Sequence, residues 1–158
     1  MKSLIILILL FSSLLNASEN SNWSDSLRVG FEIGQSNNDV KAYRFELAKD
    51  AEIESWNETG FSLQYLAALS HWEADRDELS GFSVSPILRY TFEDVFKECD
   101  IWLETGLGLI LLSEDHLDQR DFATVLQFEE QFALGLSRDH IELSVRIFHF
   151  SNGSFKSP

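Results

Sequence analysis

The stretch IELSVRIFHFS, residues 141–151, carries the pattern that decides the fold of this chain. Apolar and polar residues alternate along it, with Ile141, Leu143, Val145 and Ile147 apolar and Glu142, Ser144 and Arg146 polar. Successive side chains of a β-strand point to opposite faces, so this alternation is typical of a strand with one apolar and one polar face.

The same alternation recurs in six earlier segments, at residues 27–34, 42–48, 60–69, 82–92, 103–111 and 126–136. No stretch keeps the spacing of an amphipathic helix for long. Seven strands and no helix predict an all-β, antiparallel β-barrel. Two residues fit the pattern poorly. Pro86 lacks a ladder donor and predicts an irregularity, and Glu130 stands on an apolar face, where a bulge or a strand end that reaches water would explain it.

Two kinds of barrel could carry this pattern, a soluble lipocalin-like barrel with an apolar lumen and a membrane barrel with an apolar outer wall. The polar positions include small residues and four charges of each sign: Arg28, Arg44, Arg89, Arg146, Glu32, Glu46, Glu104 and Glu142. Paired charges suit a narrow closed interior, and the Leu- and Phe-rich opposite face suits lipid. The sequence therefore favours a barrel in the bacterial outer membrane.

The first 17 residues predict a secretory signal peptide. Lys2 precedes a continuous apolar run from Leu4 to Leu15, which is shorter than the roughly 20 residues that span a bilayer. Cleavage is expected after Ala17, which leaves residues 18–158 as the barrel domain. The alternative is a buried N-terminal helix.

Charge and cysteine content exclude other classes. The net charge of −14 argues against nucleic acid as a partner, because few side chains are present to neutralise phosphates. Cys99 is the single cysteine, so no disulfide can form within the chain.

The end of the last predicted strand holds candidate chemistry. Strand parity places His149 and Ser151 on the lipid-facing side, with Cα atoms about 6.6 Å apart at a rise of roughly 3.3 Å per residue. An imidazole next to a hydroxyl is the minimum of an activated serine nucleophile. Asn152 and Gly153 follow and could donate an amide and a backbone N–H to an oxyanion. The plain alternative is a polar rim followed by turn residues.

Several segments resemble the PagL-type lipid A 3-O-deacylases. The segment RIFHFSNG at 146–153 resembles the family's His-x-Ser-Asn signature, and upstream stretches resemble its fourth to sixth strands: PILRY at 86–90, WLETGLG at 102–108, LLS at 111–113, FAT at 122–124 and LQF at 126–128. The resemblance runs from about Leu27 to Pro158 and is most specific in the last third.

This resemblance implies an eight-stranded outer-membrane barrel that hydrolyses the ester-linked acyl chain at position 3 of lipid A, from an active site on the outer wall. It implies His149 as general base, Ser151 as nucleophile and Asn152, with Gly153, as the oxyanion hole. No metal or other cofactor is expected. The expected partners are lipid A, or lipopolysaccharide, and outer-membrane lipid. A homodimer is among the oligomeric states that the sequence allows.

The chain departs from the family pattern in two ways. Gly153 and Ser154 stand where the family often has a small residue and then Gly, which affects the backbone half of the oxyanion hole. The family's triad acid and eighth strand are expected beyond Pro158, so the sequence predicts an incomplete barrel with its last strand missing. The alternative is a product that lacks the acid and is inactive or unfolded. Glu104 and Glu142 point to the lumen by parity, so they do not replace the acid.

Other residues receive structural interpretations. The histidines His71, His116 and His140 are expected in solvated loops or turns. The tryptophans are expected in an aromatic girdle near strand ends. The remaining alternative for function is a non-enzymatic, OmpA-like small barrel with a structural or adhesive role.

Overall fold

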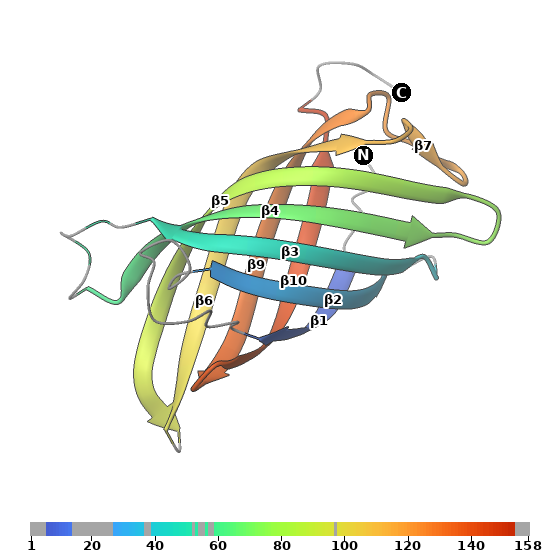
Figure 1. Ribbon diagram of the computed structural model, residues 1–158. Coiled ribbons are helices and arrows are strands. Elements are labelled where there is room, and N and C mark those ends of the chain that lie inside the picture. Colours follow the sequence, from blue (N-terminus) through green and yellow to red (C-terminus); the bar gives the residue numbers. More distant parts are fainter. Residues whose placement is uncertain are drawn as a thin grey trace.

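The computed structural model describes residues 6–13, 27–36, 39–51, 53, 56, 59–96 and 98–153. The strands in this part of the chain are β1 (Ile6–Ser13), β2 (Leu27–Ser36), β3 (Lys41–Ala51), β4 (Phe61–Glu73), β5 (Glu78–Phe96), β6 (Cys99–Leu112), β7 (His116–Leu117), β8 (Arg120–Asp121), β9 (Leu126–Arg138) and β10 (Ile141–Ser151). Eight of them form a closed antiparallel barrel in the order β1-β10-β9-β6-β5-β4-β3-β2, while β7 and β8 pair separately (Figure 1). The predicted all-β barrel is confirmed.

The seven strands expected from alternation are β2, β3, β4, β5, β6, β9 and β10. The strand β1 takes the place between β10 and β2 and pairs with both, for example Leu9 with Val145 and with Ile33. This is the position where the sequence predicts a missing strand. The segment β1 lies within the predicted signal peptide, and the proposed cleavage site at Ala17 lies outside the described residues. The signal peptide and the 18–158 domain boundary stay predictions.

The two faces of the wall differ as the alternation requires. Large apolar side chains are exposed on the outside, among them Phe31, Leu69 and Leu134, each at least half exposed. Charged side chains fill the interior, where Glu32 and Glu129 are fully buried. The outward face is therefore the one that suits hydrocarbon.

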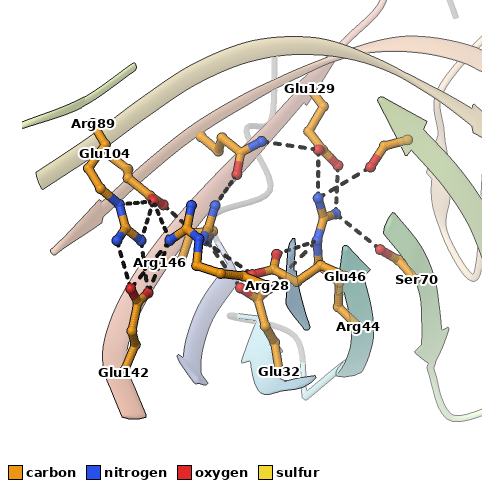
Figure 2. Close-up of polar contacts among 12 residues, drawn as sticks. Arg28, Glu32, Arg44, Glu46, Ser70, Arg89, Glu104, Glu129, Glu142 and Arg146 are labelled. Carbon is orange, nitrogen blue, oxygen red and sulfur yellow. Dashed lines mark hydrogen bonds and ion pairs between the residues drawn. The ribbon is translucent and has the colours of Figure 1, made fainter. Parts of the chain in front are cut away.

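The buried charges are paired across the lumen (Figure 2). Both guanidinium Nη atoms of Arg44 on β3 lie 2.9 Å from the two carboxylate oxygens of Glu129 on β9. Arg89 on β5 forms a similar fork with Glu142 on β10, at 2.7 and 2.8 Å. Arg146 joins Glu104 at 3.0 Å and Glu32 at 3.1 Å. The interior charges expected from the sequence are thus ion-paired, and Glu129 joins them.

An apolar cluster closes one end of the interior. It brings together Val40, Ala42, Trp72, Leu79, Ile110, Leu112, Leu117, Phe122, Phe148 and Phe150. Leu117 and Phe122 come from the segment between β6 and β9, so this segment covers the barrel mouth. The expected aromatic girdle is wrong for Trp72 and Trp102, which are 3% and 1% exposed. Both stand at inward positions of their strands, and the barrel interior has room for them.

The two irregular positions behave differently. Pro86 pairs with Tyr65 of β4, but the ladder to β6 has no partner for Ser85 or Pro86 and resumes at Ile87 in the same register. The expected irregularity is present without a shift. The β5–β6 register shifts instead between Phe92 and Phe96. Glu130 causes no bulge, because β9 pairs continuously with β10 and β6 around it.

The connections between the strands of the barrel differ in length. The strands β4 and β5 continue to Glu73 and Glu78 and leave only residues 74–77 between them. At the opposite end, the connection at 52–60 is longer than the outer turns at 37–40 and 74–77. The connection at 113–125, between β6 and β9, is longer still. Within the described residues, no helix has the length and apolar character to cross a membrane.

Candidate active site

The end of β10 presents His149 and Ser151 on the outer wall. Inward residues of this strand are buried up to Phe150, whereas Ile141, Leu143, Val145 and Ile147 are exposed. His149 and Ser151 share the parity of these exposed residues and are half-buried. The outward orientation expected from the sequence is therefore what the structure shows.

Two buried rings hold the end of β10 in place. Phe150 packs edge-on against Trp72, with ring centroids 5.5 Å apart. Phe148 lies under the Arg44 guanidinium, whose Cζ is 4.5 Å from the ring centroid. His149 thus sits between two anchored neighbours, and its strand position is fixed by the interior packing.

The residues after Ser151 form a turn that contacts the segment 113–125 between β6 and β9. The Asn152 side-chain amide donates to the Phe122 carbonyl over 3.4 Å. Gly153 has a φ of 60°, a left-handed conformation that glycine adopts without strain.

The structure brings the His149 imidazole and the Ser151 hydroxyl to one face but does not join them. In the described part of the chain, no hydrogen bond links the His149 imidazole to the Ser151 hydroxyl or to a carboxylate. Catalytic hydrogen bonds often tighten only when substrate is bound. The arrangement supplies the required side-chain types on the same side of one strand.

Glu130 is the residue near this site that sequence reasoning did not use. It pairs directly with His149 across the β9–β10 ladder and is exposed on the outward face. Directly paired residues of an antiparallel sheet have Cβ atoms about 4.5–5.5 Å apart. The signal was present in the sequence, because Glu130 is a charged residue on the apolar face of the segment 126–136.

The surroundings of His149 and Ser151 are apolar. Ser151 pairs with Phe128, and Leu126, Ile147 and Phe132 are exposed nearby on β9 and β10. Within the described residues, no group of three or more His, Cys, Asp or Glu side chains could hold a metal ion. A lipid ester at the rim of the wall would meet the hydroxyl directly.

Comparison with known proteins identifies a family for the chain. The family model described as "Lipid A 3-O-deacylase (PagL)" matches residues 40–158. The chain belongs to this family. The matched range includes β3 to β10 and all of His149, Ser151, Asn152 and Gly153. A comparison with curated proteins finds no match.

A solved structure shares the fold of this PagL-family chain. It is described as "Crystal structure of the outer membrane enzyme PagL" and superposes with a TM-score of 0.73 at 23% sequence identity. The alignment covers 82% of this chain and 89% of that chain. The family match favours the lipid A deacylase over the OmpA-like alternative.

Proposed function

We propose that this member of the PagL family is an outer-membrane carboxylic ester hydrolase that releases the 3-O-linked acyl chain of lipid A through Ser151. The observation that carries the proposal is the outward projection of His149 and Ser151 at the end of β10, among exposed apolar side chains. The substrate ester lies at the headgroup level of the outer leaflet, so it can reach Ser151 without leaving the membrane.

The reaction follows from these side chains. His149 accepts the Ser151 proton while the hydroxyl oxygen attacks the ester carbonyl, and the carbonyl oxygen becomes an oxyanion. The Asn152 side-chain amide and the Gly153 N–H are the proposed donors to that oxyanion. His149 then protonates the departing sugar oxygen. Water, activated by the same imidazole, hydrolyses the acyl-enzyme and frees the fatty acid.

The test is Ser151→Ala in the complete protein, expressed in cells with 3-O-acylated lipid A. We expect deacylation to fall by at least about 10³-fold, because the nucleophile is lost. Mass spectrometry of lipid A gives the readout, and heat-modifiable migration on gels shows that the barrel folds.

Ser137→Ala is the matched control, since Ser137 is a half-buried serine of β9 at the opposite end of the barrel. It should keep full activity. A folded Ser151→Ala protein with unchanged deacylation would reject the assignment.

The homodimer is a further proposal, which sedimentation of the detergent-solubilised protein would test.

A further inference from the structure

A second serine–histidine pair lies on the outer wall, far from β10. His71 on β4 and Ser80 on β5 are direct partners in the β4–β5 ladder. His71 Nδ1 and Ser80 Oγ are 3.0 Å apart, which is hydrogen-bonding distance. Counted around the eight-stranded barrel, β5 and β4 lie three and four strands from β10, so this pair faces the opposite side. Sequence reasoning placed His71 in a loop, and the structure corrects this.

The second imidazole nitrogen faces carboxylates. His71 Nε2 lies 3.8 Å from a Glu73 oxygen and 4.0 Å from a Glu78 oxygen. In the tautomer with its proton on Nε2, on the side of these carboxylates, Nδ1 is an acceptor for the Ser80 hydroxyl. This is the protonation pattern that a histidine base needs.

A second hydroxyl stands beside Ser80. The Ser80 backbone N–H donates to Ser113 Oγ over 3.1 Å, and the Ser113 N–H donates to the Ser80 carbonyl over 2.8 Å. These bonds fix Ser113 next to Ser80. The Ser113 Oγ acts as an acceptor here, so its own hydrogen can be donated to an oxyanion.

An apolar groove runs from this cluster along the wall. Its volume is about 570 Å³, and its lining includes His71, Ser80 and Ser113 together with the apolar Phe45, Leu69, Phe82 and Leu111. His71 and Ser80 lie nearer the rim than Leu69 and Phe82 of the same strands. Ser113 follows the end of β6 and lies nearer the rim than Leu111. The groove is therefore polar at the rim, where lipid headgroups lie, and apolar toward the middle of the wall, where acyl chains lie.

We propose that Ser80 is a second nucleophile, which cleaves the long-chain carboxylic ester of an outer-leaflet lipid whose acyl chain lies in this groove. Ser80 Oγ bonds to the ester carbonyl carbon as its proton passes to His71 Nδ1, and Ser113 donates to the oxyanion. The carbon–alkoxy bond breaks, and His71 returns the proton to the leaving alcohol. Water then hydrolyses the acyl-serine and releases the fatty acid. The proposal does not depend on Ser151.

An alkyl fluorophosphonate, which labels activated serines, tests the site in full-length protein folded in detergent. We expect Ser151→Ala protein to be labelled at Ser80, as located by peptide mass spectrometry. Adding Ser80→Ala should abolish this label, and adding His71→Gln should slow it by about 10²-fold or more, because the general base is lost. The controls Thr105→Ala, an exposed hydroxyl of the wall, and His116→Gln, an exposed histidine of the short strand β7, should change nothing.

A folded Ser151→Ala protein without label at Ser80, or with equal label after His71→Gln, would overturn the proposal and leave the pair as a structural rim contact. Two further arms identify the ester. Ser151→Ala protein is placed in phosphatidylethanolamine–phosphatidylglycerol vesicles, with or without lipopolysaccharide, and released fatty acids are measured. Ser80-dependent release in either arm supports the site and names its lipid, whereas none in both arms contradicts it. Failure of the Ser151 assignment would show separately, as retained 3-O-deacylation in Ser151→Ala protein.

Discussion

At the residue scale, the wall carries few polar side chains, and their positions distinguish their roles. His149 and Ser151 share one strand, whereas Glu130 lies on the neighbouring strand opposite His149. An exposed carboxylate near an imidazole interacts weakly, because water screens both charges. Glu130 lies close to His149 in the ladder, so we expect a weak electrostatic effect on the proposed base. This proximity alone does not make Glu130 the acid of a catalytic triad.

Glu130→Gln should consequently reduce lipid A deacylation by less than about tenfold, in line with the roughly 1 kcal/mol or less of an exposed ion pair. Rates measured with lipopolysaccharide in detergent give the readout. Glu98→Gln is the control, since Glu98 is an exposed glutamate in the turn after β5 and pairs with Arg138. A loss of 10²-fold or more would instead make Glu130 the residue that orients His149.

Gly135 shows how tightly a single inward position is packed. A Cβ atom at this position would overlap the six-membered ring of the Trp102 indole. Trp102 is 1% exposed and also lies under the Arg89 guanidinium, with Cζ 4.1 Å from the ring centroid, so it has little freedom to move. Only glycine leaves room for this indole.

Gly135→Ala should therefore destabilise the barrel by about 1–3 kcal/mol, the usual cost of overpacking. Urea unfolding in detergent, followed by tryptophan fluorescence, measures the change. Combining it with Trp102→Phe should restore part of the loss, because the smaller ring makes space. Additive losses in the double variant would show that the clash is not the cause.

At the element scale, the segment 113–125 connects the barrel interior to the proposed active site. Its Phe122 ring packs into the apolar cluster with Phe148 and Phe150. The Phe122 carbonyl accepts hydrogen bonds from Asn152 and from Gln127, at 3.4 and 3.2 Å. The position of the proposed oxyanion donor thus depends on how this segment packs.

Phe122→Ala should loosen the segment 113–125 while the barrel stays folded, because the lost contacts lie at the mouth. We expect faster amide hydrogen exchange at residues 113–125 and a lower deacylation rate. Val125→Ala, which truncates a side chain that is 40% exposed, is the control and should change neither. Unchanged exchange in Phe122→Ala protein would show that the ring does not hold this segment.

At the scale of the whole molecule, paired charges across the lumen tie distant strands together. Arg44 on β3 and Glu129 on β9 lie four strands apart in the barrel order, and both side chains are almost fully buried (Figure 2). Arg44 also donates to Ser70 and Ser83, at 3.1 and 3.2 Å. Removing Glu129 takes from the buried Arg44 its closest counter-charge and leaves only Glu32 and Glu46, at 3.7 and 3.8 Å, which is more costly than removing both partners.

Glu129→Leu should thus destabilise the barrel by about 3–5 kcal/mol, and the double variant Arg44→Met with Glu129→Leu should recover much of that loss. The midpoint of urea unfolding in detergent reports both values. A double variant as unstable as the single one would show that the pair contributes more than mutual neutralisation of charge.

The exposed apolar wall predicts how the whole protein partitions. The folded protein should enter the detergent phase on Triton X-114 separation and should precipitate when detergent is removed, because the outer face is largely apolar. Recovery of monomeric protein in buffer alone would contradict the membrane assignment and favour a lipocalin-like barrel.

The sequence by itself determined the alternating faces and the outward direction of His149 and Ser151. It also determined seven of the eight barrel strands, namely β2, β3, β4, β5, β6, β9 and β10. Each of these follows from the two-residue period of a β-strand, which is a local property. The same parity placed Arg44, Arg89 and Arg146 inside, as the structure confirms.

Only the tertiary structure decided which residues meet across strands. The pairing of Arg44 with Glu129, of His149 with Glu130 and of His71 with Ser80 depends on register and barrel order. The inward packing of Trp72 and the placement of β1 between β2 and β10 depend on closure of the barrel. Register is set by contacts between segments far apart in the chain, so a period within one segment carries no information about it.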